Sequence, residues 1–418
     1  MRSGYKQTEV GIIPMDWECT SVRGIASTAR NAIVGGPFGS DLVSADYVDD
    51  GVPVIRGTNM SGQWVSGAFV FVTLRKAKSL EANLARSRDI VFTQRGTLGQ
   101  VSLVPDRPFE CYLVSQSQMK LSVRHDRADP LFFYYVFISD YHQNLIRGGA
   151  IQTGVPHINL GILRNIPVQL PPLREQRNIA EALNDTDALL GALEQLIAKK
   201  RDLKQAVMQQ LLTGQIRLPG FQGEWEVKRL GEVAAFHKGK GLPKSAISAA
   251  GVTPCIHYGE LFTLYGEIIL DVNSCTDAIG SYFRSVKNDV LMPTSDVTPR
   301  GLAKASCVEI NEVILGGDIL VIRSDIKLIF GPFLSYLIRY EEEQVLKLVT
   351  GSTVFHLYAA DMRKFTFSMP SLNEQIAIAK VLSDMSDDLS ALEQRRSKTH
   401  DLKQAMMQEL LTGRIRLV

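Results

Sequence analysis

Two glycine-rich stretches contain residue types that can bind phosphate groups. They read GGPFGS at residues 35–40 and HKGKGLPKS at residues 237–245. A phosphate-binding loop needs the spacing G-x-x-x-x-G-K-[ST] or G-x-G-x-x-G, because its backbone N–H groups must converge on the phosphate oxygens. Neither stretch has this spacing, and we therefore predict that both form turns.

Catalytic and metal-binding patterns are also absent from the sequence. It contains no H-E-x-x-H, no G-x-S-x-G and no nucleotide-modifying N-P-P-[YF] or D-P-P-Y motif. The seven histidines are spread without metal-ligand spacing, although His157 and His356 lie 199 residues apart. These two histidines could be functional or could form structural hydrogen bonds. We find no catalytic constellation and expect a protein that is not an enzyme.

The totals indicate a multidomain protein of ordinary globular composition. With 418 residues we expect two or three domains, and the net charge of +2 points to no particular partner. The five cysteines form no C-x-x-C pair, which argues against disulfide or zinc sites and favours a reducing compartment. The longest aromatic and aliphatic run, residues 131–138, is too short to span a membrane, and no signal peptide is evident. We expect a soluble, cytoplasmic protein with no membrane partner.

An internal repeat dominates the organisation of the chain. Residues 173–218 align without a gap on residues 372–417 and are identical at 27 of 46 positions. A Trp-Glu pair also recurs, at residues 17–18 and 225–226, but there the shift is 208 residues. The segments between the matched regions therefore differ in length and share little sequence. The plan is variable head, matched helix, variable head, matched helix.

Each matched segment is predicted to be one long helix. Apolar residues recur at a spacing near 3.5, which is typical of a helix–helix seam. Ser371 with Glu374 forms a capping-box pattern, and Gly214 and Gly413 are placed to end the helices in the left-handed conformation. The following Ile-Arg-Leu is predicted to leave as an extended, strand-like segment. The predicted seam residues are Ile179, Leu183, Leu190, Leu193, Ile197, Leu203, Val207 and Leu211, and in the second copy Ile378, Leu382, Met385, Leu389, Leu392, Leu402, Met406 and Leu410.

Connectivity predicts how the two helices are arranged. A helix of roughly 40 residues spans about 60 Å. If the first helix runs from one head to the other and the second returns, the helices pair antiparallel about a pseudo-two-fold axis. Such a chain can offer nearly the same surface twice, which suits two identical partners.

Several motifs together resemble the specificity subunit of Type I restriction–modification systems. The helical segments contribute P-L-x-E-Q, L-L-T-G-x-I-R-L and then G-E-W-E-x-x-x-L-G-E at residues 223–232. The heads contribute VIRGTNM, DIVFTQRGTLGQVSLVP and IHYGELFTLYG, and YKQTEVGIIPMDWE resembles the usual opening segment. The second head departs from the first at residues 289–306, where DVLMPTSDVTPRGLAKAS replaces the QRGTLG form. The two heads are therefore expected to read different half-sequences.

The resemblance implies a fold and a domain plan. We expect two α/β (α+β) target recognition domains, at residues 1–172 and 219–371. They would be separated by an antiparallel coiled coil of two long helices, the conserved regions at residues 173–218 and 372–418.

The resemblance also implies what such a chain does. Each head would bind one half of a bipartite double-stranded DNA target, and the helical pair would set the gap between the halves. The repeated regions would bind two modification (adenine methyltransferase) subunits, joined by two restriction (translocase–nuclease) subunits. S-adenosylmethionine, ATP and Mg²⁺ would belong to those partners.

Residues able to read bases carry hydrogen-bonding groups on rigid loops, and phosphate contacts come from lysine, arginine and backbone N–H groups. Turn capping is the structural alternative for the threonine, asparagine and serine residues among them. In the first head the predicted DNA-binding residues are Arg56, Thr58, Asn59, Thr93, Gln94, Arg95, Thr97, Ser115, Gln116 and Gln118. In the second head they are Lys238, Lys240, His257, Tyr258, Glu260, Thr294, Ser295 and Arg300, with the two lysines as phosphate ligands.

Polar residues repeated along the helices are candidates for partner binding, with contacts between the two helices as the alternative. They are Glu175, Gln176, Lys204, Gln205 and Gln209, and their counterparts Glu374, Gln375, Lys403, Gln404 and Gln408.

Two other functions stay open. The chain could be a stand-alone two-headed DNA-binding scaffold or regulator without a methyltransferase partner, or an enzyme whose active site lies unrecognised in the diverged heads.

Overall fold

The computed structural model describes residues 4–152 and 154–418. The chain divides into two compact units. Unit 1 comprises Met1–Glu194 and Arg395–Val418, and unit 2 comprises Gln195–Gln394. Each unit thus combines one head with the adjoining part of both long helices. Across the described residues, no helix is both long and apolar enough to cross a membrane.

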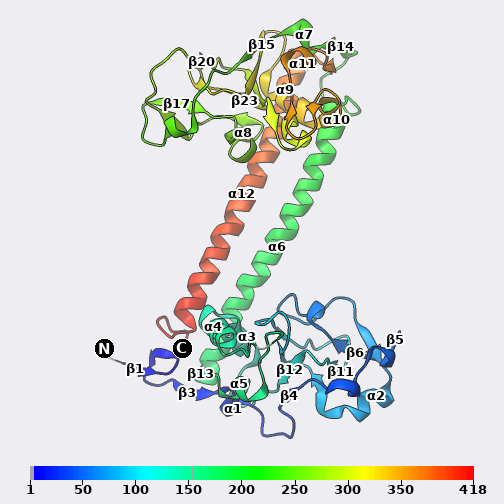
Figure 1. Ribbon diagram of the computed structural model, residues 1–418, viewed down its shortest axis with the longest axis vertical. Helices are drawn as coiled ribbons and strands as arrows, with labels where there is room; N and C mark the ends of the chain where they lie inside the picture. Colours follow the sequence, from blue (N-terminus) through cyan, green and yellow to red (C-terminus); the bar gives the residue numbers. More distant parts are fainter. Residues whose placement is uncertain (1–3, 153) are drawn as a thin grey trace. The chain divides into compact units, whose positions relative to one another are not determined.

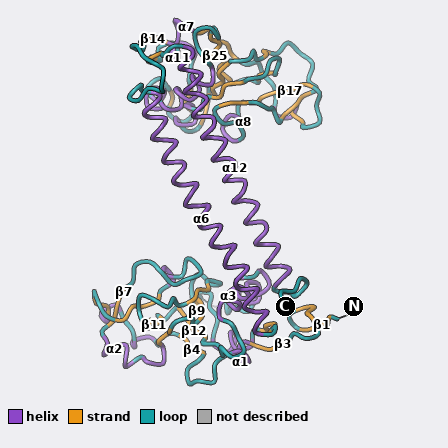
Figure 2. The backbone as a smooth tube through the Cα atoms, turned by 180° about the vertical axis from the view of Figure 1, so that it is seen from behind, coloured by secondary structure: helices purple, strands orange, loops and turns teal. Residues whose placement is uncertain are grey.

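Unit 1 contains a four-stranded sheet, a five-stranded sheet and two strand pairs. The sheet orders are β10-β9-β12-β4 and β5-β7-β6-β11-β8, and the pairs are β1-β2 and β13-β3. Figure 2 shows β4, β9, β11 and β12 gathered within the first head, and residues of β4, β9 and β12 share a core cluster with helix α3. The strands are β1 (Tyr5–Thr8), β2 (Gly11–Pro14), β3 (Glu18–Ser21), β4 (Ile33–Gly35), β5 (Tyr47–Val48), β6 (Val52–Ile55), β7 (Val70–Val72), β8 (Leu84–Arg86), β9 (Ile90–Thr93), β10 (Val101–Leu103), β11 (Cys111–Val114), β12 (Gln118–Leu121) and β13 (Pro167–Leu170).

The core helix of unit 1 is α3 (Pro130–Ile138). Asp129 caps its N-terminus through its carboxylate, and Pro130 occupies the first turn, where no backbone N–H is needed. Nearly every side chain of this helix is buried, as expected for a helix that is apolar on all sides. The apolar run 131–138 is therefore a core element. The other helices of the first head are α1 (Val22–Ile25), α2 (Leu74–Ser79), α4 (Asp140–Gly148) and α5 (Leu160–Asn165).

Unit 2 follows a related plan with differently composed sheets. Its two five-stranded sheets have the orders β15-β25-β21-β23-β18 and β16-β19-β17-β24-β20, beside β22-β27-β26 and the pair β14-β28. The strands are β14 (Glu226–Arg229), β15 (Ala234–Lys238), β16 (Ile247–Ser248), β17 (Thr253–Ile256), β18 (Ile268–Ile269), β19 (Ser274–Thr276), β20 (Phe283–Arg284), β21 (Asp289–Pro293), β22 (Ser295–Asp296), β23 (Ser306–Val308), β24 (Ile314–Leu315), β25 (Ile319–Ser324), β26 (Thr350–Gly351), β27 (Phe355–His356) and β28 (Thr366–Met369). The helices are α7 (Leu230–Val233), α8 (Glu260–Thr263), α9 (Gly331–Tyr340), α10 (Glu342–Leu346) and α11 (Ala359–Met362).

Two long helices occupy the repeated segments, as predicted. Helix α6 spans Leu173–Leu212 and α12 spans Leu372–Leu410. In unit 1 the start of α6 packs with the end of α12, and Figure 1 shows the latter, drawn in red, beside the former. In unit 2 the end of α6 packs with the start of α12. The two helices therefore run antiparallel within each unit. The buried seam residues are Ile179, Leu183, Leu193, Ile197, Leu211, Ile378, Leu382 and Leu410.

The helix ends follow the predicted signals in part. Gly214 and Gly413 adopt φ of 70° and 69°, the left-handed conformation predicted for them. The Ser371 hydroxyl accepts a hydrogen bond from the Glu374 N–H at 3.4 Å, which is one half of the predicted capping box. The strand-like exit is wrong, because residues 215–218 and 414–417 pair with no strand among the described residues.

Two predicted seam residues, Leu203 and Leu402, lie outside the seam. Their exposed fractions are 52% and 57%. Lys204 turns toward Glu267 of its head, and Lys403 turns toward Asp187 of helix α6 and the Tyr135 ring of its head. A residue one position earlier is rotated by about 100° around the helix. The leucines therefore project into solvent at equivalent positions of the repeat, and the prediction that they pack in the seam is wrong.

Candidate nucleic-acid interface

Three polar loops of unit 1 meet at one edge of its sheets. Strands β6 and β11 are parallel, so Arg56 and Ser115, which follow them, emerge at the same edge. Strand β9 is antiparallel to β12, and the Gln94 and Arg95 N–H groups both donate to the Ser117 carbonyl, at 2.7 and 3.2 Å. Strand pairing thus gathers R-G-T-N, T-Q-R-G-T and S-Q-S-Q, which lie far apart in the sequence.

The same pairing recurs in unit 2. Strands β17 and β24 are parallel, and the Gly316 N–H donates to the Ile256 carbonyl at 2.9 Å, as the Ser115 N–H does to Ile55 at 3.0 Å. Strand β21 ends beside the start of β25, where the Thr294 N–H donates to the Asp318 carbonyl at 2.9 Å. The loops that follow β15, β17 and β21 therefore meet at the equivalent edge of unit 2.

A groove in unit 1 contains many of the predicted DNA-binding residues. Its lining residues are Arg56, Gly57, Thr58, Ser61, Thr93, Arg95, Gly96, Thr97, Gln100, Ser117 and Gln118. Thr58, Arg95 and Thr97 are exposed, and Arg56 is half-buried. The Nε of Arg56 is buried, and no described residue accepts a hydrogen bond from it. An unpaired buried donor is unfavourable, so this guanidinium is suited to bind an acceptor supplied by a ligand.

Five of these lining residues were not predicted, namely the glycines Gly57 and Gly96 and three polar residues. Ser61, Gln100 and Ser117 share the groove with the predicted arginines and threonines. Ser117 lies within the S-Q-S-Q stretch, and Gln100 ends the loop that contains Thr97. Each of the three lies one to three residues from a predicted contact in the sequence, but only the loop conformation shows which neighbour faces the groove.

Asn59 and Glu260 hold equivalent turns. The Asn59 amide oxygen accepts from the Arg56 N–H at 3.1 Å, and its nitrogen donates to the Ser66 and Ala68 carbonyls. The Glu260 carboxylate likewise accepts from the His257 N–H, at 2.7 Å, and from the Ser274 hydroxyl. Asn59 is 1% exposed, so the prediction that it contacts DNA is corrected to turn capping. Glu260 also caps its turn but is partly exposed, and DNA contact by this residue stays a prediction.

Four further predicted residues of unit 1 have internal roles. Thr93 and Gln118 are buried, and the Thr93 hydroxyl donates to Gln100 Oε1 at 3.0 Å. The Gln118 amide, with its nitrogen directed at Ser115 Oγ and the Ile55 carbonyl, accepts from the Gly57 N–H at 3.2 Å. The Gln116 amide nitrogen donates to the carbonyls of residues 39 and 42, at 2.5 and 2.7 Å, although this residue is otherwise exposed. Ser115 is the fourth, as the partner of Gln118. These four side chains hold the loops in place, and a direct DNA contact is not supported for the buried Thr93 or Gln118. Gln94 remains partly exposed at the same edge.

In unit 2, four predicted residues reach the equivalent edge with polar groups accessible. Lys238 and Lys240 are exposed, and Lys238 lies 3.4 Å from Asp318 Oδ1. His257 is partly exposed, and its Nδ1 accepts from the Gly259 N–H at 3.2 Å, which leaves Nε2 as the protonated nitrogen of the neutral ring. Tyr258 packs its ring against His257, with centroids 4.7 Å apart.

The remaining three predicted residues of unit 2 lie around strand β22. Thr294 and Ser295 are partly exposed, and Ser295 pairs with His356. Arg300 is exposed and forms an ion pair with Glu342 at 3.2 Å. This edge contains lysines, a histidine and hydroxyls where unit 1 has two arginines and two threonines.

Four of the predicted partner-binding residues are buried at the head–helix junctions. Glu175 and Glu374 are each 1% exposed. Glu175 accepts from Trp17 Nε1 at 3.0 Å and from Arg416, and Glu374 accepts from Trp225 Nε1 at 3.2 Å and from Arg217.

The repeated motifs at the two ends of each long helix thus contact the motifs of the other copy. The arginine of each T-G-x-I-R-L binds the glutamate of the other copy's L-x-E-Q, within unit 1 for Arg416 and within unit 2 for Arg217. The hydrogen bonds that Arg217 donates to the Glu374 carboxylate raise the pKa of this arginine further above its ordinary value. In the same way Gln176 and Gln375 bind backbone groups of their own heads. Direct partner contact by these two glutamates and two glutamines is therefore wrong.

Lys204 joins its helix to the head of unit 2, whereas Lys403 joins the two long helices, which was the alternative to partner binding, and also contacts the head of unit 1. Lys403 binds Asp187 at 2.5 Å and lies over the Tyr135 ring, and Lys204 binds Glu267 at 3.0 Å and lies over the Tyr336 ring. Burial raises the pKa of Glu267, but the nearby Arg339 and Lys204 outweigh it and leave that pKa below its ordinary value. The glutamines Gln205, Gln209, Gln404 and Gln408 are exposed. The exposed surface shared by both repeats thus includes these glutamines and the two leucines, Leu203 and Leu402.

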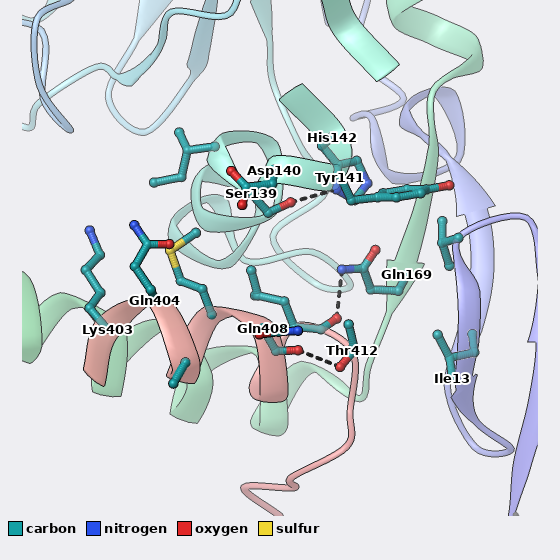
Figure 3. Close-up of a pocket in the computed structure, with 15 residues that line it drawn as sticks. Ile13, Ser139, Asp140, Tyr141, His142, Gln169, Lys403, Gln404, Gln408 and Thr412 are labelled. Carbon is teal, nitrogen blue, oxygen red and sulfur yellow. Dashed lines mark hydrogen bonds between the residues drawn. The ribbon is translucent and has the colours of Figure 1, made fainter. Parts of the chain in front are cut away.

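One copy of this surface borders a pocket in unit 1, shown in Figure 3. Lys403, Gln404 and Gln408 of α12 line one side, and Ser139 to His142 at the start of α4 line the other. His142 is buried, which lowers its pKa to about 4, and it is therefore neutral near pH 7. The pocket lining combines apolar residues, among them Ile13, Ile138 and Leu411, with polar residues of the repeated helical segment.

Comparison with known proteins assigns the family. The model of the Type I restriction modification DNA specificity domain matches the chain twice, at residues 40–201 and 222–399. A putative type I restriction enzyme MjaX specificity subunit of Methanocaldococcus jannaschii is 24% identical over 431 residues, covering 99% of this chain and 97% of that protein. The type I restriction enzyme MjaVIII specificity subunit of the same organism is 26% identical over 336 residues, covering 73% and 75%.

Solved structures share the fold. The crystal structure of the S subunit of a Type I restriction–modification system from M. genitalium matches with a TM-score of 0.61 at 18% identity, covering 94% of this chain and 96% of that one. A chain from a study of complex assembly and conformational transition in the type I system matches with a TM-score of 0.54 at 18% identity, covering 96% and 99%. The two family matches, together spanning most of the sequence, show that this chain belongs to the type I restriction–modification specificity family and is a non-catalytic DNA specificity subunit.

Proposed function

We propose that this subunit recognises a bipartite DNA target, with one half-site bound by each head and the gap between them set by the paired helices. The observation that carries the proposal is the repetition of one helical segment beside two polar edges of the same geometry but different composition. A shared frame with different side chains suits two different half-sites.

The side chains indicate how each half-site would be read. Arginine binds the O6 and N7 atoms of guanine through two parallel hydrogen bonds, and Arg56 and Arg95 line one groove. The edge of unit 2 offers His257, Thr294 and two lysines, which suit other base edges and phosphates. The first half-site is therefore expected to contain guanine opposite the groove of unit 1.

Partner subunits would bind the surface that the repeat presents twice. Each copy exposes a leucine and two glutamines, Leu203 with Gln205 and Gln209 or Leu402 with Gln404 and Gln408. Two identical modification subunits could each bind one copy, and restriction subunits would join them. S-adenosylmethionine, ATP and Mg²⁺ would be held by those partners.

The test is long-read mapping of methylated adenines in cells that carry the neighbouring methyltransferase, with and without this chain. We expect a bipartite motif with a fixed gap to appear only when the chain is present. A single continuous motif, or the same motif in both cases, would contradict the proposal. A chain that footprints two separated half-sites at physiological salt without any methyltransferase would favour the stand-alone scaffold.

Removing the Arg95 side chain should relax one position of one half-site. Arg95→Ala is expected to reduce the difference in binding free energy between the correct and a wrong base pair at one position by about 1–3 kcal/mol, because one bidentate base contact is lost. Adenine mapping and competition binding with single-base variants of the target would measure this. The other half-site should be unchanged, and Arg75→Ala, which alters an exposed arginine of α2, is the matched control. Equal loss on every sequence would identify Arg95 as a phosphate ligand instead.

Charged substitutions at the repeated leucines should each remove one partner. Leu203→Glu and Leu402→Glu are expected to lower the number of bound modification subunits from two to one, since each places a charge in one apolar contact. Native mass spectrometry of the reconstituted complex would count them. Leu196→Glu and Leu189→Glu, at other exposed leucines of α6, are the controls. Two bound subunits in both variants would place the interface elsewhere.

A further inference from the structure

The two repeated histidines end equivalent hairpins. His157 pairs with Ile151, and His356 pairs with Thr350, and both pairs are related by the same shift of 199 residues. The long helices follow the same shift, whereas the heads around the hairpins share little sequence. The hairpins are therefore a common feature of two otherwise different heads.

Each hairpin lies along the polar loop that ends the central strand of its head. In unit 1, His157 pairs with Arg95, and the Ile158 N–H donates to the Gln94 carbonyl at 3.0 Å. In unit 2, His356 pairs with Ser295, and the Leu357 N–H donates to the Thr294 carbonyl at 3.0 Å. The hairpins are thus held by backbone bonds directly beside residues predicted to read bases.

The hairpin tips, residues 154–156 in unit 1 and 351–354 in unit 2, are exposed. Each tip has an exposed valine two residues before the histidine, Val155 at 55% and Val354 at 45%. Gly154 and Gly351 turn the chain with φ of 75° and 120°. Backbone N–H groups, which both tips contain, and the hydroxyls of the exposed Ser352 and Thr353 are groups of the kind that contact phosphate and sugar.

Base-reading residues must differ between heads that read different half-sites, whereas contacts to the sugar–phosphate backbone can be the same. We infer that the two hairpin tips contact the DNA backbone at their respective half-sites, independently of sequence, and position the neighbouring base-reading loops. This inference rests on the proposed DNA-reading function of the heads. A modification subunit is also proposed to bind each half of the chain. However, the histidines that end the hairpins pair with Arg95 and with Ser295, and DNA is therefore the favoured ligand of the adjoining tips.

A charge placed at a tip tests the inference. Val354→Glu and Val155→Glu add a negative charge at exposed positions, and Val286→Glu is a matched control. Val286 is 44% exposed and precedes strand β21, at the end opposite Thr294. The full chain in complex with its modification subunits would be titrated with a duplex containing the mapped target and with a scrambled duplex, at two salt concentrations.

We expect both tip variants to weaken binding to both duplexes by about tenfold, with a smaller salt dependence, because one phosphate contact is replaced by repulsion. The methylated motif and the thermal unfolding temperature should stay unchanged, and Val286→Glu should bind within about twofold of the wild type.

Several outcomes would overturn the inference. They are equal effects of Val354→Glu and Val286→Glu, an altered motif, or unchanged DNA affinity with loss of a modification subunit. A wild-type complex that methylates no bipartite motif would instead refute the proposed function itself, so the two failures can be distinguished.

Discussion

Replacing Arg416 by methionine is expected to lower the free energy of unfolding of unit 1 by about 3–5 kcal/mol, because it leaves the Glu175 carboxylate buried without its counter-charge. Glu175 is 1% exposed and receives two hydrogen bonds from the Arg416 guanidinium, at 2.6 and 2.8 Å. Its other donor is the Trp17 indole at 3.0 Å, which carries no charge. Hydrogen exchange across urea concentrations, read separately for peptides of the two units, would measure the loss.

The repeat supplies matched controls for this prediction. Arg217→Met removes the equivalent guanidinium from Glu374 and should destabilise unit 2 by a similar amount while leaving unit 1 unchanged. The double change Glu175→Gln with Arg416→Met should recover most of the loss, since a neutral amide can still accept from Trp17. A loss below about 1 kcal/mol for Arg416→Met would show that this ion pair is not coupled to folding.

Shortening both long helices by seven residues should narrow the gap between the half-sites by about three base pairs. The seven residues span about 10 Å of helix, and base pairs are about 3.4 Å apart. Removing residues 193–199 and 392–398 takes equivalent positions from both copies and preserves the 3.5-residue spacing of the seam. Adenine mapping with the modification subunits present would give the new gap and both half-sites in one measurement.

The half-sites should be unchanged, because the heads are untouched. Removing only residues 193–199 is the control, since it leaves helices of unequal length and should reduce methylation without defining a new gap. Methylation of the original motif by the doubly shortened chain would show that the helices do not set the gap. A misfolded variant would be recognised by its circular dichroism before any mapping.

Local signals in the sequence determined the long helices and their ends. The 3.5-residue periodicity and the ungapped repeat located α6 and α12, and Gly214 and Gly413 ended them as predicted. These features depend on residues close together in the chain, where side-chain type and spacing limit the conformation directly. The exceptions are Leu203 and Leu402, which the 3.5-residue spacing placed in the seam although they are exposed. A residue one position from the seam faces solvent once the head occupies the inward side.

The sequence also located the polar loops of the candidate interface, but not the role of each residue within them. Asn59 and Glu260 look like base-reading residues from their types, yet both cap equivalent turns. Likewise Glu175 and Gln176 look like repeated surface residues, yet both are buried and form hydrogen bonds that hold the head–helix junction.

Tertiary structure decided these roles because a hydrogen-bonding side chain is defined by its partner, and these partners come from distant parts of the chain. Arg416 lies 241 residues from Glu175, and only the antiparallel packing of the two helices brings them together. The parallel pairing of β6 with β11 similarly brings Arg56 beside Ser115. The sequence by itself therefore determined which segments matter, and long-range pairing decided which of their side chains remain free to bind a ligand.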